Sequence, residues 1–366
     1  MALLAAWGRT EFGRYAAAVG AAVWLTPLVQ AGPEKAILKL FPRARRTRSD
    51  LIRPLRAAVA FLPLPFGAVA VAVTVVQPSG TAALYCTAAA YHVSLGCTLL
   101  GTALYRALGR PGYDLAGYAV LSAGLAVLLG STLLVGLPPI VFLWGLLTLT
   151  TALNVAFVRG LPAGGPRTGR TGRLLAATVL LMGAPEVMTN AATSALYVEL
   201  AFTGHADQSG ELYLVLMGWS LLIAAGYFAQ RMFQPAASVR LTGHGAALGR
   251  ARARRLAQAV LWAGPLWFAA AALAVAVVDA RIVLLVALTA SRVPLYLAMA
   301  YATYLLENTG SRNLRSTAAG GVAGLVAVVL TGAVTVPLFG AVGAVFALAV
   351  KEVVLAPVVI RAAGRT

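Results

Sequence analysis

Long apolar runs alternate with short polar connections along the whole chain. A membrane-spanning helix needs about 20 predominantly apolar residues, and by that criterion the sequence contains eleven complete runs. They lie near residues 15–32, 57–77, 82–105, 115–135, 139–158, 174–202, 212–232, 257–278, 282–305, 317–336 and 341–360. Residues 1–7 resemble the end of a further span that precedes the first. The pattern therefore predicts an all-α polytopic transmembrane protein with eleven full spans and a stub.

Composition supports this interpretation and restricts the possible partners. The chain is 60% hydrophobic and 11% charged, whereas a soluble domain has about 25% charged residues. A net charge of +18 is compatible with nucleic-acid binding. The cations, however, lie in short blocks between apolar runs and form no continuous basic face. We therefore expect membrane lipid, and no nucleic acid, around this protein.

The charge of the connections predicts an orientation in the membrane. Nearly all Lys and Arg lie in alternate connections, at 33–56, 106–114, 159–173, 233–256 and 306–316, and in the tail from Arg361. The intervening connections, at 77–81, 136–139, 203–211, 278–281 and 336–343, hold almost none. Since Lys and Arg near a span keep a loop on the cytoplasmic side, we expect a multi-pass protein of the cell membrane with a cytoplasmic C-terminus.

Two stretches of the chain share a pattern of span, basic inner loop and span. Residues 11–66 align with 209–267, so that Tyr15 matches Tyr213 and Phe61 matches Trp262. Two unrelated membrane hairpins would share some of this similarity, but the matching loop charge favours a repeat. Two lobes of equal orientation follow, with boundaries at 1–158 and 174–366 and a cytoplasmic inter-lobe loop at 159–173.

The basic segment after the first run has two interpretations. In residues 33–42, PEKAILKLFP, the apolar side chains fall on one side of a helix, with Lys35 and Lys39 on another. Such a helix would lie in the inner interface, with its lysines extended towards headgroups. An ordinary polar connection explains the segment equally well.

Three stretches are similar to one family of membrane proteins. Residues 11–43 resemble the second helix and first inner loop of the polysaccharide-exporting flippases of the MOP (MATE-like) superfamily, and residues 210–241 resemble the eighth helix. Residues 306–361, with the corner PLFGAVGA at 337–344, are similar to the last two helices. The resemblance implies a two-lobe helical bundle that moves undecaprenyl-pyrophosphate-linked oligosaccharide across the membrane. It also implies that most of the first helix is missing, through a misplaced start or a truncation.

Four charged residues at membrane depth are the first candidates for a site, because such charges are costly unless they face protein, water or a partner. Arg292 and Lys351 would attract a pyrophosphate or acidic sugar, and Glu186 or Glu352 would exchange a proton. The structural alternative is a helix-to-helix pair of Arg292 with Glu352. Neighbouring positions on a helix point about 100° apart, so Lys351 and Glu352 are not expected to share one face.

Two uncharged polar residues complete the candidate set. His92 is the only imidazole at membrane depth, where it could titrate near neutral pH, and Asn190 could line the same region. Each is equally explained as a hydrogen-bonded packing residue. The sequence has no nucleotide-binding, metalloprotease or nucleophile-elbow motif and no metal-ligand spacing, so we expect neither an enzyme nor a cofactor.

Other functions remain compatible with the sequence. A MATE-type drug or cation antiporter would use Glu186 or Glu352 for its coupling ion. A membrane glycosyltransferase or polymerase of lipid-linked sugars usually has a large outer loop, and the longest outer connection here, 203–211, is short. An inactive remnant is the last alternative. A monomer is expected.

Overall fold

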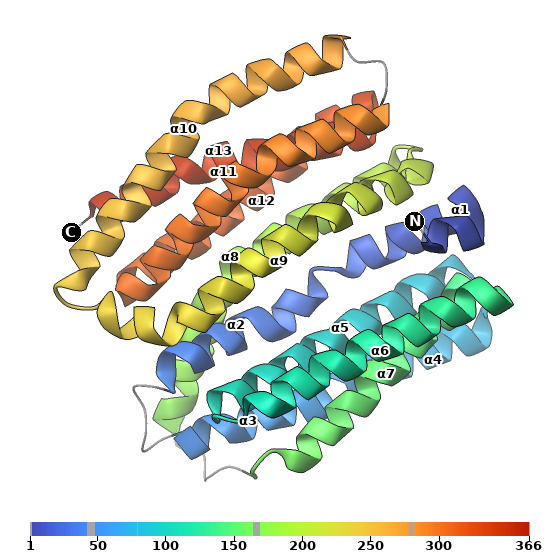
Figure 1. Cartoon of the computed structure of the whole chain (residues 1–366), viewed down its shortest axis with the longest axis horizontal. Helices are drawn as coiled ribbons and strands as arrows, with labels where there is room; N and C mark the ends of the chain where they lie inside the picture. Colours follow the sequence, from blue (N-terminus) through green and yellow to red (C-terminus); the bar gives the residue numbers. More distant parts are fainter. Residues whose placement is uncertain (1, 42–47, 79, 164–168, 278–280, 366) are drawn as a thin grey trace. The chain divides into compact units, whose positions relative to one another are not determined.

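The computed structural model describes residues 2–41, 48–78, 80–163, 169–277 and 281–365, and no β-strand occurs within these ranges. The helices follow in the order α1 (Ala2–Ala22), α2 (Leu25–Leu40), α3 (Arg48–Phe61), α4 (Pro63–Val76), α5 (Thr81–Ala107), α6 (Pro111–Val135), α7 (Pro139–Gly160), α8 (Gly169–Phe202), the short 3-10 helix η2 (Ala206–Gln208), α9 (Ser209–Arg240), α10 (Gly245–Val277), α11 (Arg281–Thr309), α12 (Ser311–Phe339) and α13 (Ala341–Gly364). Figure 1 shows their course.

Among the described residues, eleven helical segments are long and apolar enough to cross a membrane. The number is eleven because α1 and α2 form one segment, Ala2–Leu40, and α3 and α4 contribute to another, Leu51–Val76. The predicted all-α fold with eleven spans is therefore confirmed. Helix α3 ends at Phe61, and Pro63 begins α4, as expected for a residue that favours the first turn of a helix.

The chain divides into two compact units, Met1–Gly183 and Ala184–Thr366. The division falls inside α8. The predicted inter-lobe loop at 159–173 includes residues 164–168, which lie outside the described ones. The lobe boundaries at 158 and 174 stay a prediction.

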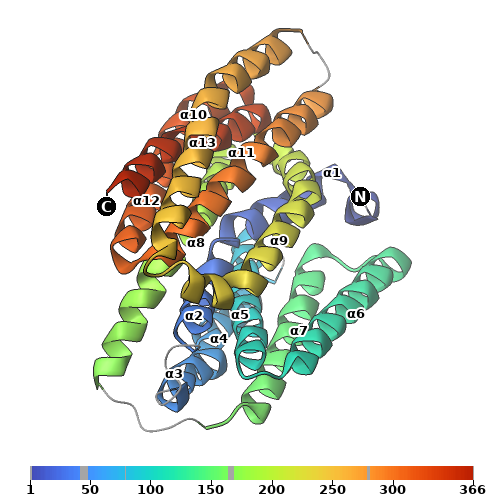
Figure 2. The ribbon, with the colours of Figure 1, turned by 60° about the vertical axis from the view of Figure 1, so that its left-hand side comes forward.

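Helix α5 is the centre of the first unit, where it packs against α2, α4 and α7. Small residues on α5 permit this, because an added Cβ at Gly96 would lie 2.8 Å from the Thr26 carbonyl oxygen in α2. Helices α6 and α7 pack beside one another, as both views show (Figures 1 and 2). The core of this unit thus depends on close backbone approach as well as on large apolar side chains.

The first residues of the chain form a short helical segment that turns at Gly8. Gly8 adopts φ 72° and ψ 174° inside α1, a conformation that glycine accommodates without steric cost. The turn directs Trp7 onto Tyr15 and Phe142, with ring centroids 5.1 and 5.6 Å away. The indole Nε1–H of Trp7 also donates to the Leu137 carbonyl at 2.6 Å.

Helices α12 and α13 form a tightly packed hairpin in the second unit. An added Cβ would lie 2.6 Å from Leu355 Cδ1 at Gly320, and 2.8 Å from Lys351 Cγ at Gly324. Both glycines of the Gly-x-x-x-Gly sequence therefore face α13. At the turn, the Thr335 hydroxyl donates to the Gly343 carbonyl at 2.9 Å.

In each unit, alternate connections meet at the same end. In the second unit the α12–α13 turn contacts the α8–α9 connection, where Ala341 N–H donates to Gln208 Oε1 at 2.8 Å, and Arg281 pairs with Glu211 at 2.8 Å. In the first unit Arg14 donates to the Thr81 hydroxyl at 3.3 Å. These contacts join connections that the sequence assigns to the outer side.

The connections assigned to the inner side also meet one another. Arg56 Nε–H donates to the Val158 carbonyl at 3.1 Å in the first unit. In the second unit, Gly249 at the start of α10 lies against Thr309 at the end of α11. The alternation within each unit agrees with the predicted topology, whereas the cytoplasmic location of this end stays a prediction.

Both interpretations of residues 33–42, the interfacial helix and the ordinary polar connection, are wrong for the described part of that segment. Helix α2 continues through Pro33 to Leu40, so the segment up to that residue extends the preceding helix. Glu34 is 2% exposed and Lys39 is 7% exposed. Lys39 is therefore packed within protein and does not extend towards headgroups.

Candidate functional site

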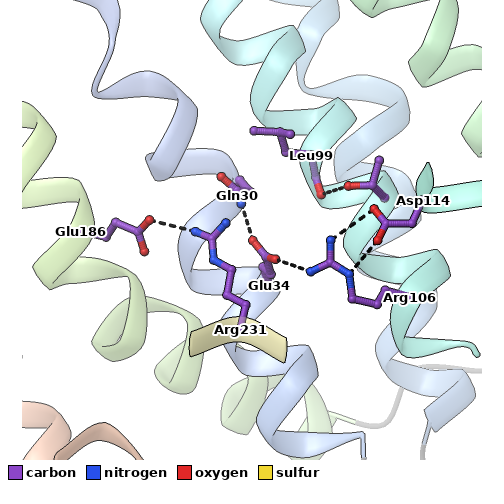
Figure 3. Close-up of polar contacts among 8 residues, drawn as sticks. Gln30, Glu34, Leu99, Arg106, Asp114, Glu186 and Arg231 are labelled. Carbon is purple, nitrogen blue, oxygen red and sulfur yellow. Dashed lines mark hydrogen bonds and ion pairs between the residues drawn. The ribbon is translucent and has the colours of Figure 1, made fainter. Parts of the chain in front are cut away.

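A pair of opposite charges links α8 and α9 in the second unit. Glu186 follows Pro185 inside α8, and its Oε1 accepts a hydrogen bond from Arg231 Nη2 at 2.9 Å. The side chains are 11% and 18% exposed, respectively. Figure 3 shows this contact. Sequence reasoning identified Glu186 but missed Arg231, which lies at the end of the apolar run 212–232 and was not distinguished from the basic connection that follows.

A second group of charges is buried between α11 and α13. Arg292 Nη2 lies 3.3 Å from Glu352 Oε1, and Lys351 Nζ lies 3.7 Å from the same oxygen. The three side chains are at most 6% exposed. The structure therefore forms the helix-to-helix pair of Arg292 with Glu352 that the sequence offered as its structural alternative.

The charged groups of Lys351 and Glu352 lie close together, although the two residues are neighbours on one helix. The prediction from helical geometry is wrong here, because it fixes only the direction of the Cβ atoms. The lysine side chain has four methylene groups and can bend back along the helix. Its stem lies against Gly324, and its ammonium group thereby reaches the neighbouring carboxylate.

Two tyrosines connect the two charged groups. Tyr227 of α9 and Tyr296 of α11 share a hydrogen bond between their hydroxyls at 2.7 Å. The Tyr296 ring centroid lies 5.6 Å from Arg292 Cζ and 5.3 Å from Lys351 Nζ, and the Tyr227 centroid lies 5.9 Å from Arg231 Cζ. These distances permit cation–π attraction, so each cation lies near an aromatic ring.

We call these seven residues the charged cluster: Glu186, Tyr227, Arg231, Arg292, Tyr296, Lys351 and Glu352. With both tyrosine hydroxyls neutral and the other five side chains charged, it holds three cations and two carboxylates, so one positive charge is in surplus. Arg292 Nε and Lys351 Nζ are buried and make no hydrogen bond within the described protein. Buried donors of this kind require an acceptor, and an anionic group or water would supply one.

The structure places the remaining candidates differently. Asn190 lies one turn after Glu186 in α8, and its side-chain amide donates to the Glu186 carbonyl at 2.9 Å. His92 belongs to the first unit, where Nδ1 lies 2.9 Å from the Thr26 hydroxyl, and it is 5% exposed. Of the six predicted site residues, the cluster contains Glu186, Arg292, Lys351 and Glu352.

Sequence reasoning missed a second set of ion pairs, which lies in the first unit where α5 ends and α6 begins. Arg106 of α5 contacts both carboxylate oxygens of Asp114 in α6, at 2.8 and 3.2 Å, and lies 3.5 Å from Glu34 Oε1 in α2. Gln30 donates a hydrogen bond to Glu34, as Figure 3 shows. The sequence did contain a signal: Glu34 and Asp114 are acidic residues in connections that are otherwise rich in cations.

The turn between α5 and α6 brings Arg106 and Asp114 together. Gly109 adopts φ 76°, a left-handed conformation that ends the helix, and Arg110 N–H donates to the Tyr105 carbonyl at 2.9 Å. Within the described residues, no group of three His, Cys, Asp or Glu side chains is arranged to hold a metal ion.

Comparison with known proteins identifies the fold. No protein-family model matches the chain, and no curated protein matches its sequence. A solved structure described as the inward-facing conformation of a multidrug resistance MATE family transporter of the MOP superfamily matches 98% of this chain and 88% of its own, with TM-score 0.53 and 16% identity.

Two further structures agree with it. An outward-facing multidrug resistance MATE family transporter has TM-score 0.51 and 16% identity, and it matches 98% of this chain and 86% of its own. A MOP superfamily transporter from Pyrococcus furiosus, whose description reports reverse polarity of its binding pocket, has TM-score 0.51, 14% identity and the same coverage. The chain therefore has the fold of the MATE-like transporters of the MOP superfamily, a class of multi-pass membrane proteins.

Proposed function

We propose that this protein is a membrane transporter that moves an undecaprenyl-pyrophosphate-linked oligosaccharide across the cell membrane by alternating access. Two observations support the transport class: the eleven segments able to span a membrane and the fold shared with MOP superfamily transporters. The observation that carries the choice of an anionic substrate is the positive surplus of the charged cluster. A pyrophosphate cannot cross hydrocarbon without such partners.

Within this proposal the cluster residues have distinct roles. Arg292 and Lys351 attract the pyrophosphate, because their buried Nε and Nζ atoms lack hydrogen-bond acceptors in the described protein. Glu352, already 3.3 Å from Arg292, balances their charge when the substrate is absent. Arg231 pairs with Glu186 at 2.9 Å, and Glu186 accepts a proton when that contact opens.

The function is tested with purified full-length protein in liposomes. Fluorescently labelled undecaprenyl-pyrophosphate oligosaccharide is placed in both leaflets, and an impermeant quencher measures its movement between them. We expect movement faster than in protein-free liposomes, and slower movement with the Lys351→Met variant. Equal rates with and without protein would overturn the proposal, provided that circular dichroism and size-exclusion chromatography show a folded protein.

A MATE-type antiporter is the second candidate, favoured by the buried carboxylate of Glu186 next to Arg231 and by the multidrug transporters among the structural matches. The same liposomes distinguish it. Proton-driven uptake of a cationic dye such as ethidium, without movement of the lipid-linked sugar, would favour the antiporter.

We further infer that the C-terminus lies in the cytoplasm and that the protein acts as a monomer. The basic connections at one end of each unit support the orientation. A single cysteine introduced at Gly364 tests it, in a variant with Cys86 and Cys97 replaced by serine. An impermeant maleimide should label this cysteine only after whole cells are opened. Light scattering of the detergent complex tests the monomer.

A further inference from the structure

The α8–α9 connection and the α12–α13 turn are joined by one buried amide. Gln208, in η2, is 8% exposed, and its Oε1 accepts the backbone N–H of Ala341 at 2.8 Å. Gly340 adopts φ 56°, and a Cβ at this position would collide with the Gln208 amide. The turn and the amide are therefore fitted closely to one another.

The donor at Ala341 fixes the direction of the next two hydrogen bonds. A backbone N–H can only donate, so the Gln208 oxygen faces Ala341 and its NH₂ group faces His205 Nδ1, at 3.1 Å. His205 Nδ1 must then accept. The ring proton of a neutral imidazole is consequently on Nε2, which lies 3.3 Å from the Pro337 carbonyl and donates to it. The three bonds can exist together only while His205 is neutral, because the bond from Gln208 needs Nδ1 as its acceptor.

The surroundings of His205 hold few charges. The ionisable residues of the adjoining helices are Glu199 at the end of α8, Asp207 in η2 and Glu211 at the start of α9, and Glu211 pairs with Arg281 of α11 at 2.8 Å. The stretch 336–344 of the α12–α13 turn has no charged residue. Among the described residues, no ion pair involves His205.

We propose that His205 and Gln208 form a pH-sensitive latch between the α8–α9 connection and the α12–α13 turn. A protonated imidazole has two donors and no acceptor. If the Gln208 amide stays as it is, its NH₂ meets a second donor at Nδ1. If the amide rotates, its NH₂ meets the Ala341 N–H instead. In the first case the donor–donor repulsion displaces the Gln208 side chain, and in the second its oxygen turns away from Ala341, so both weaken the bond to the Ala341 N–H in acid.

This inference stands apart from the proposed substrate, because it rests on hydrogen-bond direction at one end of the second unit. Imidazole is the side chain whose charge ordinarily changes between about pH 5 and 8. The sequence assigns both latch segments to the outer side of the membrane, where protons are in excess in an energised cell. The latch would therefore loosen on the side from which protons enter.

Hydrogen–deuterium exchange of the full-length protein in lipid nanodiscs tests the latch. The peptide covering 337–344 reports the Ala341 amide. After correction for the intrinsic pH dependence of exchange, we expect about tenfold faster exchange at pH 5.5 than at pH 8.0, as loss of a buried hydrogen bond implies. The interior of α12 should show no such change, which serves as the check on folding.

Two variants and a matched control make the result specific. His205→Gln keeps an acceptor and a donor but cannot be protonated, so its exchange should be independent of pH. Gln208→Met removes the amide and should exchange at the fast rate at both pH values. His244→Gln changes a histidine outside the latch and should behave as the unmodified protein. A pH-independent unmodified protein, or an unchanged pH dependence in His205→Gln, would overturn the proposal.

Discussion

The hydroxyl of Tyr227 lies 2.7 Å from the hydroxyl of Tyr296, and this single bond connects the two charged groups of the second unit. On one side, Arg231 faces the Tyr227 ring and pairs with Glu186. On the other, Arg292 and Lys351 face the Tyr296 ring. The tyrosines thus place an aromatic ring beside each cation without adding a negative charge to the cluster.

Substitution at Tyr296 should separate the two contributions of this side chain. Tyr296→Phe removes the hydroxyl bond and keeps the ring, so the transport rate should fall about fivefold, since a neutral hydrogen bond contributes roughly 1 kcal/mol. Tyr296→Leu also removes the cation–π contacts, each contributing up to about 2 kcal/mol when desolvated, and should be nearly inactive. The liposome assay measures both.

A matched control is available at Tyr301, which stacks on Tyr304 in the same helix and lies outside the cluster. Tyr301→Phe should transport at the unmodified rate. Equal rates for Tyr296→Phe and Tyr296→Leu would show that the ring contributes nothing to holding the cations.

Removal of Arg292 should destabilise the second unit through Glu352. The carboxylate is 1% exposed, and Arg292→Met leaves it with Lys351 alone. Breaking a buried ion pair from one side costs about 3–5 kcal/mol, so the thermal midpoint in detergent should fall by several degrees. The double variant Arg292→Met, Glu352→Met should recover much of that loss, because no buried carboxylate is then left with a missing partner.

Transport distinguishes a functional pair from a structural one in the same variants. We expect the double variant to be stable and inactive. A double variant that moves substrate at the unmodified rate would assign Arg292 and Glu352 to structure alone.

Arg106 should be important for the stability of the first unit. Arg106→Ala removes the cation that contacts both Asp114 and Glu34, at a cost of about 3–5 kcal/mol. Arg106→Lys should recover only part of this, because an ammonium group cannot reproduce the two parallel contacts to Asp114. Thermal unfolding followed by tryptophan fluorescence measures the order. Arg110→Ala, an exposed cation in the same connection, is the control and should change little.

Gly32 is expected to tolerate no side chain. A Cβ at this position would lie 2.3 Å from the Val179 backbone carbonyl oxygen, a contact that cannot be relieved by a side-chain rotation. Gly32→Ala should therefore lower the thermal midpoint. Gly67→Ala in α4, where nothing lies within 4 Å, should raise it slightly through better helix propensity. A neutral Gly32→Ala would show that α8 moves aside easily.

The spans were predictable because hydropathy is a local property of about 20 residues. Nine of the eleven apolar runs correspond to a single helix, and the runs 15–32 and 57–77 are each divided between two consecutive helices. The alternation of the connections between the two ends of each unit was predictable from the same order of apolar runs. The contacts of the site were less predictable. Tyr227 and Tyr296 carry no charge and are 69 positions apart, so nothing in the sequence marked them as partners.

Charged residues were placed correctly only where the span boundary was clear. Glu34, Lys39 and Arg106 were interpreted as parts of loops, because charge ends an apolar run in a hydropathy count. In the structure α2 and α5 continue past the apolar runs, and Glu34 and Lys39 on α2 are buried. Hydropathy measures transfer from water to lipid, and it contains no information about pairing with other protein groups.

Gly324 has a consequence beyond helix packing. The Lys351 stem rests where a side chain at 324 would be, so the position of that ammonium group is set by an uncharged residue on a different helix. The position of a positive charge in the cluster can therefore be changed without substituting any ionisable residue. In the proposed transporter, substitution of Gly324 would displace the Lys351 ammonium group and so alter the binding of an anionic substrate.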